Sequence, residues 1–147
     1  MQNSKIFISR SHGGYNENCT WLALYDTGTA SRLYSTYIYD TNSSTALVDF
    51  SNLDIMLYVG CSTAYGGETG SNLATASVNA GAKCAIGFEE TISCNGANSW
   101  TSYFTKFYTE GETIEDAAQL AAEQTAYDYP LLYETNKLNV DSYCIVQ

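Results

Sequence analysis

The sequence has 147 residues, of which 45% are hydrophobic, so it is long enough for one buried core and too short for two large domains. We therefore expect one globular domain covering residues 1–147. Six Lys and Arg against sixteen Asp and Glu give a formal net charge of −10, which argues against nucleic-acid or membrane partners and favours basic peptides or proteins. An acidic balance also keeps many proteins soluble, and this simpler explanation stays open.

The compartment and cofactors of the protein are only partly constrained by the sequence. The N-terminus lacks the apolar stretch of a signal peptide, although the many Tyr, Ser, Thr and Asn residues would also suit an exported or cell-surface protein. Five cysteines with one histidine and no C-x-x-C pair argue against a zinc site. We expect no metal and no organic cofactor, and at least one thiol that is free or bonded to another chain.

The first predicted elements along the chain are strands. Residues 5–9 form a short strand signal that runs into His12 and its following glycines. Residues 21–25 and 32–39 are aromatic and β-branched runs on either side of a turn at 26–29, which predicts a hairpin or a pair of edge strands.

The middle of the chain predicts the interior of a parallel sheet. Residues 46–53 indicate a short helix, and the continuous apolar run at 55–59 is typical of a buried parallel strand that ends at Gly60 and Cys61. Gly66, Gly67 and Gly70 predict a flexible loop, which lacks the Gly-Lys-Ser/Thr ending of a phosphate loop.

Helices and strands alternate in the remainder. Ser71 or Asn72 can cap a helix that Gly81 ends, and residues 83–88 form another buried strand. An aromatic stripe at helical spacing predicts the next helix, formed by Trp100, Tyr103, Phe104, Phe107 and Tyr108.

A further helix and a strand complete the predicted elements. Gly111 interrupts the helical pattern, Thr113 with Asp116 opens another helix that ends before Pro130, and residues 143–146 predict a last strand. The alternation indicates an α/β layer architecture.

His12 and Cys61 are the residues that suggest chemistry. Both follow predicted strands, and in open α/β sheets ligands bind beyond the carboxyl ends of the strands. An imidazole next to a cysteine accepts its proton and stabilises the thiolate nucleophile. Cys61 follows His12 by 49 positions, and caspases place their histidine about 50 residues before the cysteine.

The flanking residues resemble a known family. Residues 6–13, which include His12-Gly13, resemble the strand and His-Gly motif of clan CD cysteine peptidases, the caspase-like group. Residues 57–62, which contain Gly60-Cys61-Ser62, are similar to the Gly-Cys-Ser motif of separases and CHAT domains, and the resemblance covers about residues 5–127. It implies a caspase-haemoglobinase-like, mostly parallel sheet flanked by helices, without the first strand-helix units of the family.

The resemblance also implies an activity and a set of site residues. On the matching positions, His12 is the general base, Cys61 is the nucleophile, and the backbone N–H groups of Gly13 and Cys61 form an oxyanion hole. Separase-like relatives bind a basic residue before the scissile bond in an acidic pocket. Glu89 and Glu90, which follow the strand at 83–88, are the candidates here, and both fit a solvated loop equally well.

His12 and Cys61 also have simpler interpretations. A lone His beside Gly is commonly a turn residue, and a lone Cys after an apolar strand is commonly a small buried hydrophobe. A serine esterase using Ser62 is excluded because its histidine would have to follow the nucleophile. A catalytically inactive caspase-like binding or assembly module is the alternative function. The uncovered edge of the histidine strand predicts a companion chain or a homo-oligomer.

Overall fold

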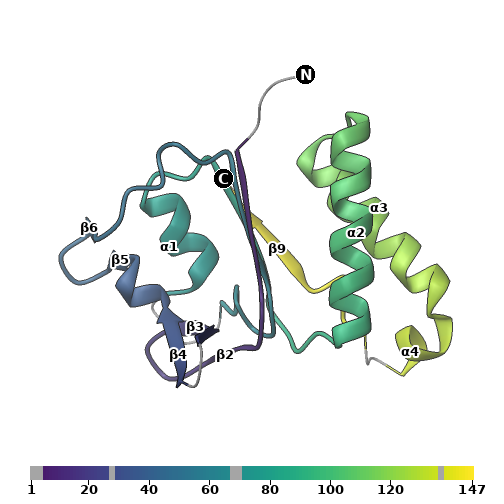
Figure 1. Cartoon of the computed structure of the whole chain (residues 1–147), viewed down its shortest axis with the longest axis horizontal. Coiled ribbons are helices and arrows are strands. Elements are labelled where there is room, and N and C mark those ends of the chain that lie inside the picture. The colour runs from purple at the N-terminus through teal and green to yellow at the C-terminus, as the bar shows by residue number, and fades with distance from the viewer. Residues whose placement is uncertain (1–4, 27–28, 67–70, 136–137) are drawn as a thin grey trace. The chain divides into compact units, whose positions relative to one another are not determined.

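The computed structural model describes residues 5–26, 29–66, 71–135 and 138–147 (Figure 1). Residues 67–70 of the expected glycine loop and residues 27–28 of the expected turn lie outside these ranges. The chain divides into two compact units, Met1–Glu89 with Cys144–Gln147, and Glu90–Tyr143. That all 147 residues form one caspase-like domain stays a prediction.

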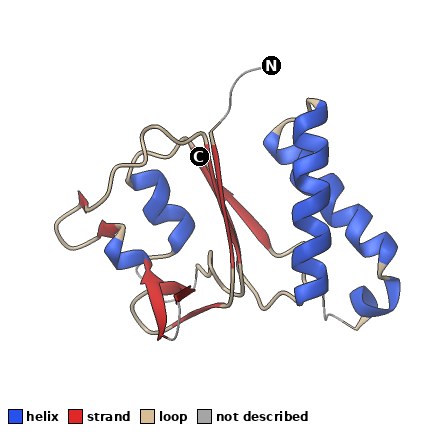
Figure 2. Cartoon of the chain, in the orientation of Figure 1, coloured by secondary structure: helices blue, strands red, loops and turns tan. Residues whose placement is uncertain are grey.

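A four-stranded sheet lies mainly in the first unit (Figure 2). Its strands, in spatial order, are β1 (Ile6–Arg10), β7 (Ile55–Val59), β8 (Cys84–Phe88) and β9 (Tyr143–Val146). β1 pairs with β7 and β7 pairs with β8, both in parallel. The prediction of a mixed α/β fold with a mostly parallel sheet is therefore confirmed.

The two inner strands differ from the edge strand in burial. Every residue of β7 and β8 is buried, as expected of strands that are covered on both faces and read as continuous apolar runs. In β1, by contrast, Phe7 and Ile8 are 48% and 43% exposed. β1 is thus an edge strand with apolar side chains in contact with solvent.

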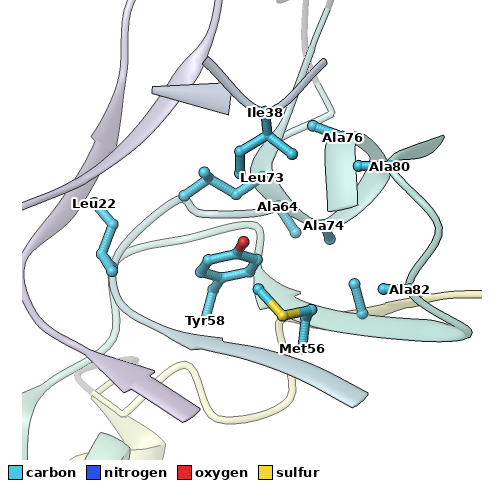
Figure 3. Close-up of a cluster of buried hydrophobic side chains, with 11 residues drawn as sticks. Leu22, Ile38, Met56, Tyr58, Ala64, Leu73, Ala74, Ala76, Ala80 and Ala82 are labelled. Atoms are coloured by element: carbon cyan, nitrogen blue, oxygen red, sulfur yellow. The ribbon is translucent and has the colours of Figure 1, made fainter. Parts of the chain in front are cut away.

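Helix α1 (Leu73–Asn79) contributes to the core beside the sheet (Figure 3). The Asn72 side chain caps it by accepting the Thr75 N–H, as predicted. Tyr58 points from β7 toward α1, where its hydroxyl lies 2.8 Å from Ser77 Oγ, and burial raises the pKa of Tyr58 to about 12. The rest of this core consists mostly of small and aliphatic side chains, which include Leu22, Ile38, Met56, Ala64, Leu73, Ala74, Ala76 and Ala80.

A second, antiparallel sheet follows β1 directly. It consists of β2 (Gly13–Tyr15), β3 (Thr20–Asp26) and β4 (Thr29–Tyr34), in that order across the sheet. A 3₁₀ turn η1 (Ser35–Tyr37) and the short pair β5 (Tyr39–Asp40) and β6 (Thr45–Ala46) come next. The predicted strand pair is confirmed, although its second strand ends at Tyr34 because the chain turns there instead of continuing to residue 39.

The short helix expected at residues 46–53 is wrong. This segment forms the end of β6 and a series of turns. Asp49 accepts the backbone N–H of Ser51, and the Leu53 N–H donates to the Phe50 carbonyl. Side-chain bonds of this kind from Asp compete with helical bonding and favour turns. The Phe50 N–H also donates to Ala80 at the end of α1.

The second unit is helical. It contains α2 (Cys94–Glu110), α3 (Ile114–Asp128) and α4 (Pro130–Glu134). The predicted aromatic stripe lies on α2, where Trp100 and Phe104 are buried and stack at 5.1 Å between ring centroids. Thr113 caps α3 as predicted, whereas Pro130 begins α4. Among the described residues, no helix combines the length and apolar character needed to cross a membrane.

Candidate active site

His12 and Cys61 lie beyond the carboxyl ends of two adjacent parallel strands. In the register of this pair, Arg10 of β1 is opposite Val59 of β7. His12 and Cys61 each follow these partners by two positions, and the Ser11 N–H extends the pairing by donating to the Val59 carbonyl at 3.2 Å. The structure therefore brings together the two residues that the sequence predicts to be catalytic, with His12 exposed and Cys61 half-buried.

Two glycines allow the loops after β1 and β7 to touch. A Cβ placed on Gly13 would lie 2.4 Å from the Cys61 carbonyl oxygen and 3.2 Å from the Cys61 nitrogen. A Cβ on Gly60 would lie 2.6 Å from the Ser11 carbonyl oxygen and 3.3 Å from the Gly13 nitrogen. These separations leave no room for a side chain, so glycine at both positions permits the backbones of the two loops to approach. The amides of Gly13 and Cys61, predicted to form the oxyanion hole, lie within this contact.

The turn after Cys61 is strained and buried. Ser62 has a φ of 55°, a left-handed conformation that is uncommon for a residue with a side chain. It is only 6% exposed. Such backbone strain persists where the surrounding structure fixes it, and it is concentrated at functional sites.

Thr63 fixes this turn to the two strands beside it. Its buried hydroxyl shares its proton between the carbonyl oxygens of Tyr58 and Gly60, at 3.0 and 3.1 Å. The same oxygen accepts the Phe88 N–H at 3.1 Å. The Ala64 N–H in turn donates to the Phe88 carbonyl at 3.0 Å. The ends of β7 and β8 and the Cys61 turn therefore form one hydrogen-bonded unit.

A second buried threonine connects the turn to β3 and α1. Thr20 Oγ1 donates to the Thr63 carbonyl at 3.1 Å and accepts the Leu73 N–H at 2.8 Å. The Leu73 N–H also donates to the Thr63 carbonyl at 3.1 Å. Because Thr20 and Thr63 are both fully buried, losing either hydroxyl would remove hydrogen bonds from buried backbone groups. No sequence motif marks this role, since Thr20 bonds to distant Thr63 and Thr63 bonds to Phe88 of β8.

The stacked rings of Tyr15 and Tyr65 also join the two loops. Their centroids are 4.1 Å apart with 21° between the ring planes. Tyr15 ends β2, in the loop region of His12, and Tyr65 lies in the turn after Cys61. The stack therefore crosses from the histidine side of the site to the cysteine side.

The antiparallel sheet is attached to the site through His12. The Ala23 N–H donates to the His12 carbonyl at 2.7 Å. A hollow of about 660 Å³ opens beside His12 and is lined by Trp21, Ala23, Ser31, Arg32, Tyr34 and Tyr37. Neither the aromatic lining nor Arg32 was identified as functional from the sequence.

Glu89 and Glu90 follow β8 and are exposed. Glu89 comes directly after Phe88, whose backbone is bonded to Thr63 and Ala64, so it lies at the same carboxyl edge of the sheet as Cys61. Its charge also acts on Cys144 of β9, where burial first and Glu89 second raise the pKa of the thiol. Glu90 is the first residue of the second unit.

The five cysteines, all within the described residues, form no disulfide. Cys19 and Cys84 are buried, Cys61 and Cys144 are half-buried, and Cys94 is exposed at the start of α2. In the described part of the chain, no three side chains of His, Cys, Asp or Glu come together as a metal site would require.

No protein-family model matches this chain. A search of the curated proteins also finds no match. The resemblance to caspase-like peptidases therefore rests on the two motifs and their spacing, and His12 and Cys61 follow the ends of neighbouring strands.

Proposed function

We propose that this protein is a caspase-like cysteine endopeptidase that uses a Cys61–His12 dyad. The register of β1 and β7 supports this most directly, because His12 and Cys61 each follow the last paired residues, Arg10 and Val59, by two positions at the carboxyl ends of adjacent parallel strands. The close backbone contact at Gly13 and the buried hydrogen bonds of Thr63 add to it, since both hold the Cys61 turn in one position.

In the proposed reaction, His12 takes the proton of Cys61 and the thiolate attacks the scissile carbonyl carbon. The carbon–sulfur bond forms, and the oxyanion is stabilised by the N–H groups of Gly13 and Cys61. The carbon–nitrogen bond then breaks while His12 returns the proton to the leaving amine. Water, deprotonated by His12, hydrolyses the thioester and releases the acid product.

The proposed specificity is for Arg or Lys immediately before the scissile bond. Glu89 supports this, because it follows β8 at the edge where Cys61 lies and is exposed. A carboxylate can form a charge-assisted, bidentate pair with a guanidinium. The net charge of −10 also favours a basic substrate. Glu90 is the next candidate along the same loop.

Cleavage of a defined peptide mixture, followed by mass spectrometry, tests this function. We expect wild type to cleave after basic residues, Cys61→Ala and His12→Ala to be inactive, and Cys94→Ala to retain activity. Cleavage that persists in Cys61→Ala would exclude the dyad. Peptide binding by wild type without any cleavage would instead favour the alternative, a catalytically inactive caspase-like binding or assembly module.

A further inference from the structure

The hollow beside His12 is built on one face of the antiparallel sheet. Ala23 is opposite Arg32 and Trp21 is opposite Tyr34 in the pairing of β3 with β4. Residues two apart on a strand share a face, so these four side chains lie on the same side of the sheet. Ala23, Trp21, Arg32 and Tyr34 all line the hollow.

Arg32 is held in place within this hollow. Its guanidinium carbon lies 4.2 Å from the centroid of the Trp21 ring, a cation–π arrangement that orients the group over the indole face. Tyr34 and Tyr37, which also line the hollow, meet edge to face at 5.3 Å between centroids. A cationic group in a partly aromatic hollow suits a ligand that carries a carboxylate, because guanidinium pairs bidentately with it.

Ala23 connects Arg32 to His12. The Ala23 N–H is bonded to the His12 carbonyl, and Ala23 pairs across the sheet with Arg32. Of the proposed catalytic pair, His12 lines the hollow, whereas Cys61 is not among its described lining residues. In a cysteine peptidase, the imidazole faces the leaving amine, to which it returns the proton. A hollow that extends from His12 therefore lies on the leaving-group side of the scissile bond.

We propose that this hollow is a subsite for a carboxylate on the leaving-group side of the substrate, recognised by Arg32 over Trp21. The inference rests on the proposed peptidase function. The carboxylate belongs either to an Asp or Glu side chain after the scissile bond or to the C-terminus of a short leaving peptide. With Glu89 on the other side of Cys61 in the proposed scheme, the preferred substrate is basic before the cleaved bond and acidic after it.

Binding to Cys61→Ala protein tests this subsite without requiring turnover. Fluorescent peptides with an Arg before the uncleaved bond would carry Glu or Gln after it, each with a free or an amidated C-terminus, and binding would be measured by anisotropy. We expect the Glu peptide to bind roughly three- to tenfold more tightly than the Gln peptide, given the exposure of Arg32. Arg32→Gln should remove this preference, and Arg32→Lys should retain part of it.

Lys106→Gln is the matched control, because it removes the same charge from another exposed cation that lies over an aromatic ring, Phe107. The Lys106→Gln variant should prefer the Glu peptide over the Gln peptide as strongly as the parent protein does. Tighter binding by free-acid peptides alone would identify the C-terminal carboxylate as the ligand. Equal binding of all four peptides, with neither the Glu side chain nor the free C-terminus favoured, would overturn the subsite. Equal weakening of all four peptides by Arg32→Gln would overturn it as well.

This binding assay distinguishes failure of the proposed subsite from failure of the proposed peptidase function. If wild type cleaves peptides but Cys61→Ala shows no carboxylate preference, the subsite is wrong and the dyad stands. If the Arg32-dependent preference is found in a protein that never cleaves, the carboxylate site stands and the peptidase function is wrong.

Discussion

Thr63 is the residue on which the geometry around Cys61 most depends. Its hydroxyl lies among the backbone groups of Tyr58, Gly60 and Phe88, all within 3.1 Å. Valine keeps the shape of threonine and removes these bonds, leaving a buried N–H and two buried carbonyl groups with one partner fewer. We expect Thr63→Val to lower the free energy of unfolding by about 1–3 kcal/mol, measured by urea denaturation.

The same substitution should slow alkylation of Cys61, because the turn that carries the thiol is no longer fixed to β7 and β8. Thr105→Val is the control: Thr105 bonds the Thr101 carbonyl on the exposed side of α2, and its loss should change stability by no more than about 0.5 kcal/mol. Equal effects of the two substitutions would mean that Thr63 has no special role at the site.

Glu89 is the residue on which the basic specificity depends most. If its carboxylate faces the substrate residue before the scissile bond, Glu89→Gln should reduce kcat/KM for Arg and Lys peptides by roughly tenfold, the loss of one charge-assisted pair. Cleavage of a peptide with a neutral residue at that position should change little. Glu90→Gln, tested beside it, distinguishes the two glutamates. A basic preference unchanged in both variants would remove them from the pocket.

The contact between the loops after β1 and β7 depends on glycine. Because a Cβ on Gly13 would lie 2.4 Å from a backbone oxygen of Cys61, Gly13→Ala must push the loops apart. We expect a destabilisation of about 1–3 kcal/mol and loss of cleavage. Gly66→Ala provides the control, since a Cβ there meets nothing within 4 Å. Retained activity in Gly13→Ala would show that close approach of the loops is unnecessary.

The elements differ in how far the sequence could predict them. The apolar run at residues 55–59 predicts β7 because its burial on both faces leaves a continuous pattern. The capped helices are also predictable, since Asn72 and Thr113 act on N–H groups three residues ahead. Residues 46–53 are mispredicted because Asp49 stabilises a turn and Phe50 bonds to distant Ala80.

The candidate site was only partly predictable from the sequence, because some of its contacts join elements that are far apart in the chain. His12 and Cys61 follow strand signals, so their place at one edge of a parallel sheet could be inferred from the sequence. The contacts of Thr20, of Thr63 and of the hollow around Arg32 include residues in other elements. Thr20 and Thr63, for example, bond to each other although they are more than 40 positions apart in the sequence. No local pattern encodes contacts between elements that are brought together only by folding.

The exposed edge of the central sheet affects how whole molecules associate. Within the described residues, β1 has β7 as its only sheet neighbour, and its Phe7 and Ile8 are 48% and 43% exposed. An uncovered apolar edge strand is a template for pairing with another chain. We expect the protein to form a dimer or to bind a companion chain, and light scattering over a concentration series would detect self-association.

A charge on this edge should weaken the association. Ile8→Lys places a cation among the exposed apolar side chains of β1, a common natural means of blocking edge pairing. Leu131→Lys adds the same charge on α4, where Leu131 is 76% exposed, and should leave the association unchanged. A strict monomer at all concentrations, with no co-purifying partner, would contradict this prediction.

Selective labelling of the cysteines tests whether His12 activates Cys61. A peptide electrophile ending in Arg would be reacted at neutral pH, and the modified cysteines would be located by peptide mapping. Cys94 serves as an internal reference because it is exposed at the start of α2. We expect rapid labelling of Cys61 alone in wild type and loss of that labelling in His12→Ala, with Cys94 reacting equally slowly in both proteins. Comparable labelling of several cysteines, or an unchanged rate at Cys61 in His12→Ala, would contradict this activation.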